Sequence, residues 1–101
     1  MDNLIRPTIG RQVWFWESGN LHRLHDGTPH GVIPKFQPEA ATVVRVWGDR
    51  MINVQVIDCN GSARSQCSVA LQQPGDEIPE GPHCSWMGYQ IGQARAQKAI
   101  E

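Results

Sequence analysis

Two apolar runs on either side of a short connection constrain the fold of this chain more than any other feature. The runs cover residues 40–47 and 51–58, and residues 48–50, Gly-Asp-Arg, separate them. Apolar segments joined by a short connection that contains glycine are typical of a β-hairpin. Residues 10–16 are dense in β-branched and aromatic side chains, so they predict another strand that precedes the hairpin.

The rest of the chain is organised around these strands. An Asn-Gly turn signal at residues 60–61 follows the hairpin, and residues 62–71 predict a fourth strand. Residues 17–39 contain three glycines and three prolines without a helical or strand period, so we expect a long loop there. Residues 74–83 form a connector rich in proline and glycine. The tail, 84–101, includes a stretch at 89–100 that favours a short helix despite Gly92.

These elements predict a single domain, 1–101, with its strand core at residues 10–71. The length agrees, because 101 residues suffice for one small hydrophobic core and not for two. Short strands with a long loop after the first favour a mainly β fold. We expect a small half-open barrel of SH3-like or Tudor-like type that ends in a short C-terminal helix or an extended tail. Because such a sheet buries little apolar surface alone, we also expect a homo-oligomer.

Charge and hydropathy exclude several classes of function. Nine basic side chains stand against ten acidic ones, for a net charge of −1, so we expect no binding to long nucleic acids. No apolar run approaches the roughly 18–20 residues of a membrane-spanning helix, so no membrane partner is expected. Residues 1–7 lack the layout of a signal peptide, which predicts an intracellular protein.

Cysteine and histidine indicate neither a disulfide framework nor a metal centre. The three cysteines, Cys59, Cys67 and Cys84, are odd in number and form no C-x-x-C motif. The histidines of the long loop lie among glycine, aspartate, threonine and proline, so we interpret them as solvated loop residues rather than metal ligands. They are His22, His25 and His30.

Side chains alternate across a strand, so each predicted strand divides into a core face and an outer face. The aliphatic sets are expected in the core, and they are Val13 and Phe15, Val44 and Val46, and Ile52, Val54 and Val56. The opposite faces then carry Gln12, Trp14, Trp16, Val43, Arg45, Trp47, Asn53, Gln55 and Ile57. Tryptophan, arginine and amide side chains therefore gather on one predicted surface.

This predicted surface has the chemistry of a small-nucleotide site. Aromatic faces stack on bases, arginine binds phosphate oxygens in a bidentate manner, and amides read base edges. The candidate ligand-binding residues are Arg11, Trp14, Trp16, Arg45, Trp47, Arg50, Asn53 and Gln55, with Arg64 as a further arginine. The alternative is an oligomer interface, where tryptophan and arginine are also enriched. Both interpretations hold if the pocket lies between subunits, with the histidine-bearing loop as its lid.

The sequence does not favour an enzyme. The acidic residues at strand ends, Glu17, Asp49 and Asp58, have no paired acid at a defined spacing, and no G-x-x-x-x-G-K-[ST] phosphate loop is present. Cys67 would be a nucleophile only if a loop histidine folded over it, and we expect a small buried hydrophobe instead. We predict no catalytic residue, no metal and no cofactor.

Five sequence blocks form a recognisable pattern. They are G-R-x-V at 10–13, A-A-x-V-x-x-V-W at 40–47, V-x-V-x-D-x-x-G at 54–61, S-V-x-L at 68–71 and C-x-W-M-x-Y-Q-x-G-Q-A at 84–94. In these blocks the chain resembles a widespread group of small proteins encoded by tailed phages and prophages. The resemblance spans most of the chain, and the last block is its most specific part. The group has no activity known to us, so the resemblance supplies a context rather than a mechanism.

A phage context implies a short list of functions. Small β-rich phage proteins include sponges, which bind cyclic oligonucleotide or cyclic ADP-ribose signals and so block host antiviral signalling. By analogy with them, we expect a non-enzymatic anti-defence protein that sequesters a small nucleotide in the cytoplasm of the infected bacterial host. The alternatives are a minor virion or assembly protein, or a protein-binding inhibitor of a host factor.

Overall fold

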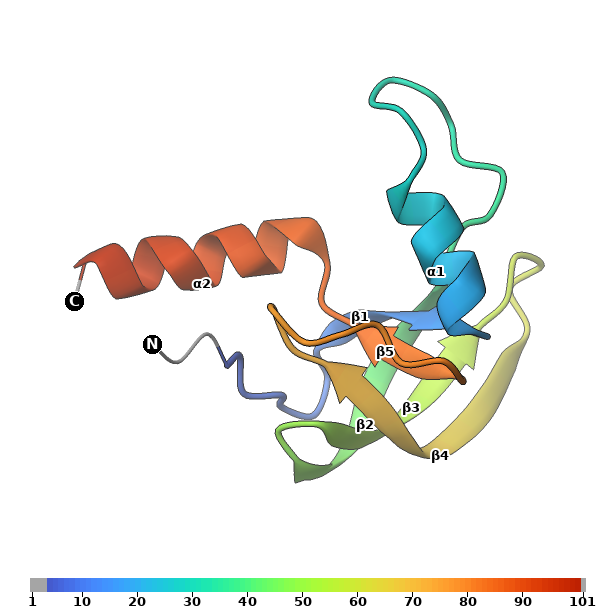
Figure 1. Cartoon of the computed structure of the whole chain (residues 1–101). Coiled ribbons are helices and arrows are strands. Elements are labelled where there is room, and N and C mark those ends of the chain that lie inside the picture. The colour runs from blue at the N-terminus through green and yellow to red at the C-terminus, as the bar shows by residue number, and fades with distance from the viewer. Residues whose placement is uncertain (1–3, 101) are drawn as a thin grey trace.

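The protein folds into a small β-barrel with two helices (Figure 1). The computed structural model describes residues 4–100, and the side chains of residues 4–97. In chain order the elements are β1 (Gln12–Trp16), α1 (Gly19–Asp26), β2 (Glu39–Gly48), β3 (Met51–Ile57), β4 (Ala63–Gln72), β5 (His83–Ser85) and α2 (Gly88–Ile100). The prediction of a mainly β, SH3-sized barrel with a C-terminal helix is confirmed.

The barrel is closed, whereas the sequence predicted a half-open one. Strands β1 to β4 form an antiparallel meander, in which each strand pairs with the next. The short strand β5 closes it, because it pairs in parallel with β4 and antiparallel with β1. The pairs Ala70↔His83 and Trp14↔Ser85 show the two sides of this closure. Residues 83–85 had been divided between a connector and a tail, so this strand was missed.

The core lies inside the barrel and is mainly aliphatic. Its most deeply buried members include Val13, Phe15, Val43, Ile52, Val54, Val56, Leu71 and Cys84. The predicted core faces of β1 and β3 are confirmed. The assignment for β2 was wrong at two positions, because Val43 is fully buried and Val44 is 48 % exposed. The physical reason is an irregularity in the β2–β3 register between Val43 and Arg45, which reverses the alternation and still leaves Val46 against the core.

Residues 17–39 are not a continuous loop, because α1 occupies Gly19–Asp26. Ser18 is the N-cap, and its side chain accepts a hydrogen bond from the Leu21 N–H. Only Gly19 and His22 of this helix are buried, so no apolar stripe marked it in the sequence. Residues 27–38 have no helix or strand and extend from the barrel beyond α1 in Figure 1.

The predicted helix in the tail is confirmed as α2, which leaves the barrel and extends outward (Figure 1). Its first turns are attached to the barrel: Ile91 and Ala94 pack against the core, and the Gln90 side chain donates to the Gln12 carbonyl at 2.8 Å. The last residue of the predicted tail, Glu101, lies outside the described residues. Within residues 4–100, no helix is long and apolar enough to cross a membrane.

Candidate functional site

A cleft of about 430 Å³ lies on the outside of the barrel, where α1, β1, β5 and the start of α2 meet. Its volume falls within the range of small-ligand sites in proteins. The turn after β4, which includes Pro74 and Gly75, forms a further wall. The principal side chains that line the cleft are Trp14, Trp16, Trp86, His22, His25, Asp26 and Arg95.

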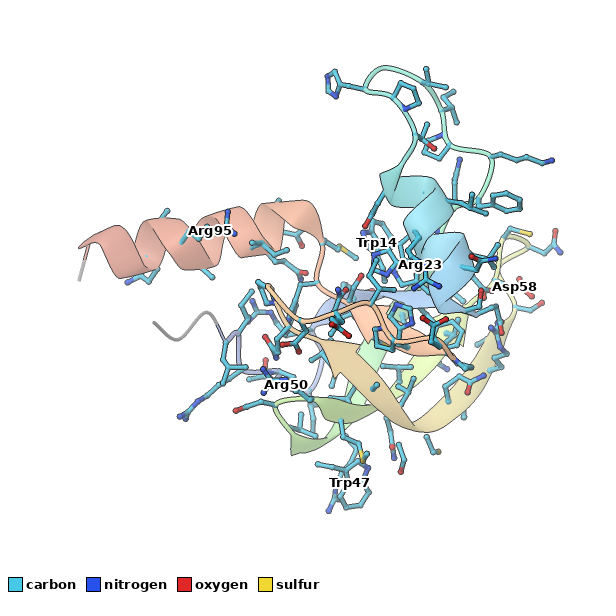
Figure 2. The ribbon with its side chains drawn as sticks, in the orientation of Figure 1. Trp14, Arg23, Trp47, Arg50, Asp58 and Arg95 are labelled. Carbon is cyan, nitrogen blue, oxygen red and sulfur yellow. The ribbon has the colours of Figure 1, made fainter. Side chains whose placement is uncertain are left out.

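The three tryptophans of the cleft differ in how far their rings are buried and in the contacts that the rings already make. Trp16 is buried and stacks on His22 with a centroid separation of 4.2 Å, and its indole N–H donates to the Ser85 hydroxyl. Trp86 is buried, and the Arg11 guanidinium lies 5.4 Å from its ring centroid. Trp14 is only half-buried and lies between α1 and the first turns of α2 (Figure 2). Trp14 is therefore the ring that offers the most accessible face to a ligand.

A chain of hydrogen bonds through two buried histidines anchors α1 to the barrel. Nδ1 of His83 lies 2.9 Å from the Gly81 carbonyl oxygen, and Nε2 of His83 lies 2.8 Å from Nδ1 of His22. A carbonyl oxygen only accepts, so Nδ1 of His83 carries its proton. Nε2 of a neutral His83 is then an acceptor, and Nδ1 of His22 must donate to it. The Gly81 carbonyl thus fixes the tautomers of both rings.

The second nitrogen of His22 faces a carboxylate. Nε2 of His22 lies 3.4 Å from Oδ2 of Asp26, one helical turn further along α1. Burial lowers the pKa of His22, and the nearby Asp26 carboxylate only partly opposes this effect. Burial also lowers the pKa of His83. Both rings are therefore neutral near pH 7, with the lone pair of His22 Nε2 directed toward the Asp26 carboxylate.

The remaining charges near α1 are distributed on two sides. Arg95 of α2 lines the cleft and supplies a positive charge there. Arg23 points to the other side of α1 and donates to the Glu80 carboxylate at 3.0 and 3.2 Å. Gly19 lies so close to residues 79 and 80 that an added Cβ would collide with the Pro79 carbonyl oxygen. The helix is therefore held against the connector by backbone contact as well as by charge.

The structure brings together only part of the predicted ligand-binding surface. Trp14 and Trp16 line the cleft, whereas Trp47 lies on the β2–β3 hairpin, away from Trp14 (Figure 2). Arg45 and Asn53 belong to the same two strands. There the Arg45 guanidinium covers the Trp47 ring at 4.7 Å, and the Trp47 indole N–H donates to Asn53 Oδ1 at 2.9 Å. The same oxygen accepts the Ser68 backbone N–H at 2.6 Å. Asn53 Oδ1 therefore links the Trp47 side chain on β2 to the Ser68 backbone on β4.

The other predicted residues also have structural partners or lie apart from the cleft. Arg50 forms a bidentate ion pair with Asp76 at 2.8 and 3.1 Å. Arg64 binds Glu39 and Glu17, and the Arg64 hydrogen bond lowers the pKa of Glu39. Arg11 stacks on Trp86, and Gln55 is exposed on β3. These side chains do not form one continuous site.

The cysteines differ from the expectation made for Cys67. Cys67 and Cys59 are exposed, so Cys67 is not a buried hydrophobe. Its position on β4 follows the register irregularity opposite β3 near Val54, which sequence alternation does not reveal. Cys84 is the buried cysteine, and burial raises its pKa to about 12. Among the described side chains, no group of three or more histidine, cysteine or acidic residues could hold a metal ion.

The interpretation of His22 as a solvated loop residue was wrong, because His22 is buried in α1 and lines the cleft. Three further residues of the cleft were not predicted, namely Asp26, Trp86 and Arg95, and neither was the partner of His22, His83. Trp86 belongs to the distinctive block at 84–94, which could have directed attention to it. His22 and His83 are 61 residues apart, and no local pattern pairs them. Comparisons of the chain with protein-family models, with curated proteins and with solved structures found no match.

Proposed function

We propose that the protein is a non-enzymatic binding protein that holds a small nucleotide in the cleft beneath α1. The observation that carries this proposal is the half-buried Trp14 ring in a cleft that Arg95 also lines. Stacking of a base on an aromatic side chain contributes about 1–3 kcal/mol. An arginine that lines the same cleft can donate a bidentate pair of hydrogen bonds to a phosphate.

The size and charge of the cleft favour one nucleotide unit. A volume of about 430 Å³ lies near the lower end of the usual range for ligand pockets. The cleft is lined by one arginine, Arg95, and one carboxylate, Asp26, so it suits a base at one end and a phosphate at the other. A cyclic di- or trinucleotide would place one of its units in each cleft, which is compatible with the homo-oligomer that we propose.

The biological role that we propose follows from the resemblance to phage-encoded proteins. A sponge sequesters a nucleotide signal without converting it, so it needs a tight cleft and no catalytic group. We propose that the protein acts in this way on a cyclic oligonucleotide or a cyclic ADP-ribose type of signal in the cytoplasm of an infected bacterium. Neutral, partly apolar surroundings for one base fit this role better than a basic coat does.

A second candidate function is favoured by the surface of the hairpin. Val44, Trp47 and Met51 are each about half exposed and lie on neighbouring strands. An exposed apolar group of this kind is typical of a protein interface. It supports an assembly role, an inhibitor that binds a host protein, or the contact between copies of this chain.

Calorimetric titration and thermal shift against cyclic di- and trinucleotides and cyclic ADP-ribose isomers test the nucleotide proposal. We expect at least one of them to bind and to raise the melting temperature. Trp14→Ala should weaken that binding by about 10-fold or more, whereas the matched variant Trp47→Ala should leave it unchanged. Arg95→Gln and its control Arg45→Gln form a second pair. No binding by any nucleotide, or equal losses in Trp14→Ala and Trp47→Ala, would overturn the proposal.

A further inference from the structure

The hydrogen-bond directions at the cleft point to one kind of base. We propose that the cleft selects a base that presents two adjacent N–H donors, which among the common nucleobases is guanine, and that His22 Nε2 and the Asp26 carboxylate accept them. This inference rests on the proposed nucleotide function, since it identifies which nucleotide the same cleft prefers. His22 and Asp26 do not belong to the ligand-binding surface that the sequence predicted.

The hydrogen bonds around His22 determine which of its ring nitrogens carries the proton. The Gly81 carbonyl accepts from His83, and His83 accepts from His22, at 2.9 and 2.8 Å. The donor of a neutral His22 is therefore committed to Nδ1, and its Nε2 is left with a lone pair. The stack of His22 on Trp16, at 4.2 Å and 5° between the ring planes, holds that ring in place.

The second step concerns the neighbour of that lone pair. Oδ2 of Asp26 is also an acceptor, and it lies 3.4 Å from His22 Nε2. Two acceptors this close have no hydrogen bond between them unless a proton is added or a donor approaches both. His22 is only 6 % exposed as a whole residue but lines the cleft, and the Asp26 side chain is 56 % exposed, so both acceptors can be approached from the cleft. A ligand with two neighbouring N–H groups would satisfy both acceptors.

The third step compares the common bases. Guanine presents its ring N–H and its exocyclic amino group side by side on the Watson–Crick edge. Adenine presents an acceptor next to its amino group, so it would leave one of the protein acceptors facing a lone pair. Hypoxanthine retains the ring N–H but lacks the amino group. The three bases therefore form a graded series: guanine satisfies both protein acceptors, hypoxanthine satisfies one, and adenine satisfies one while its ring nitrogen repels the other.

Other residues of the cleft can contact the purine ring and the phosphate of a guanine nucleotide. Trp14 lines the same cleft and is half-buried, so it can stack on the purine. Arg95 lies on α2, whereas His22 and Asp26 lie on α1, so the phosphate and base partners come from different walls. A guanine nucleotide would thus be held at its edge, its face and its phosphate.

Protonation of His22 should compete with the ligand. An imidazolium would place a proton on Nε2 and donate it to Asp26, which removes the acceptor pair. The titratable and charged groups around His22 are Arg23, His25 and Asp26 on α1, His83 on β5, and Arg95 across the cleft. Because burial keeps the pKa of His22 below its ordinary value, the acceptor pair is present at neutral pH.

The test is calorimetric titration of the full chain with 5′-GMP, 5′-IMP and 5′-AMP at pH 7.5 and at pH 5.5. At pH 7.5 we expect GMP to bind about 10-fold more tightly than IMP and about 100-fold more tightly than AMP, because hydrogen bonds to charged or buried acceptors are strong. Lowering the pH until the folded His22 takes up a proton should decrease the preference for GMP, and because burial lowers the pKa of His22, the decrease should be found below the ordinary value of 6.5. Asp26→Asn should reduce the GMP preference over IMP to less than about 3-fold, whereas the matched surface variant Glu77→Gln should retain it.

The outcomes separate this inference from the proposed function. Similar affinities for GMP, IMP and AMP, or a GMP preference that survives in Asp26→Asn, would overturn the assignment of guanine and leave the nucleotide cleft intact. Absence of binding by all three mononucleotides and by every cyclic nucleotide would overturn both. Asp26 is exposed and its variant is not expected to unfold, so circular dichroism should confirm the native fold of each protein.

Discussion

The cleft beneath α1 and the tip of the β2–β3 hairpin carry the same kinds of side chain in different surroundings. Both have tryptophan and arginine together with polar groups that form hydrogen bonds. On the hairpin, Arg45 covers the Trp47 ring and Asn53 accepts its N–H, so these exposed groups satisfy one another. In the cleft, Trp14 and Arg95 line a hollow, and His22 and Asp26 present two acceptors without a donor.

Residue type alone therefore does not identify a candidate binding site. The hairpin residues have used their hydrogen-bonding capacity within the protein, so a ligand would have to displace existing contacts. The cleft residues belong to elements that meet only in the folded barrel, and part of their capacity remains for a ligand.

The largest effect is expected where α1 touches the connector. Gly19→Ala would place a methyl group against the Pro79 carbonyl, because the added Cβ has no room there. We expect the free energy of unfolding to fall by about 2–3 kcal/mol, since the obstruction is backbone rather than a flexible side chain. Urea denaturation followed by circular dichroism measures the loss.

The matched glycine in the other region is Gly48 at the end of β2, where an added Cβ meets nothing within 4 Å. Gly48→Ala should change the stability by less than about 0.5 kcal/mol. Equal losses in the two variants would contradict the conclusion that α1 is docked by close backbone contact. Gly19→Ala should also bind the nucleotide more weakly than Gly48→Ala does, because α1 forms one wall of the cleft.

The second prediction uses the histidine pair, which is present only on the cleft side. His22 and His83 have pKa values lowered from the ordinary 6.5, mainly by burial. In the unfolded chain they take up protons as the pH falls through about 6.5, whereas the folded protein resists this protonation, so stability must decrease below that pH. Denaturant titrations at pH 7.5 and pH 5.5 should show a lower free energy of unfolding at the acidic value.

This window lies above the ordinary pKa values of 4.5 for Glu39 and 3.8 for Asp76, so their ion pairs persist through it. The exposed His30 supplies the control, because His30→Gln should leave the pH dependence unchanged. A stability that is constant between pH 7.5 and 5.5 would show that the buried pair is not neutral in the native state.

The third prediction concerns the hairpin. Asn53→Ala removes the acceptor of both the Ser68 backbone N–H and the Trp47 indole N–H. Since both donors lie near solvent, we expect a loss of about 1 kcal/mol and no change in nucleotide binding. Chemical denaturation and calorimetry measure the two quantities. Gln55→Ala, at an exposed position on the same strand, should be close to neutral, and a loss of binding in Asn53→Ala would return the hairpin to the candidate site.

The last prediction concerns the reactivity of the three thiols, which chemical labelling measures without a substitution. Cys84 of β5 is fully buried with its pKa raised to about 12, whereas Cys59 and Cys67 are exposed. Iodoacetamide at pH 8 should modify two thiols in the native protein and the third only in denaturant, because the thiolate is the reactive form. Mass spectrometry counts the adducts. Rapid native labelling of Cys84 would indicate that the β4–β5–β1 seam opens readily.

Local patterns were sufficient for most of the barrel. The hairpin, the core faces of β1 and β3, and α2 all follow from alternation, turn residues and composition. Three features escaped because their causes are tertiary. Val43 and Val44 exchange roles through a bulge, α1 has only two buried positions, and the three residues of β5 gain their strand geometry from two neighbours at once.

The site was less predictable than the fold. Trp14 and Trp16 were correctly set on the outer face of β1, but their partners come from α1, β5 and α2. The acceptor pair depends on a carbonyl at residue 81 that fixes two ring tautomers, and no sequence motif encodes such a chain. Strand alternation also placed Arg45, Trp47 and Trp14 on one predicted surface, although a closed barrel turns its outer faces in different directions.

Strand β5 follows β1 to β4 in the chain, so it is synthesised after both strands with which it pairs. The meander from β1 to β4 is complete once residue 72 has left the ribosome, but its two outer strands wait for residues 83–85. Until then both strands expose unpaired backbone groups, which are templates for association with other chains. Because α2 and β5 contribute walls of the cleft, the nucleotide binding that we propose would be confined to the finished barrel and would favour its closure by mass action.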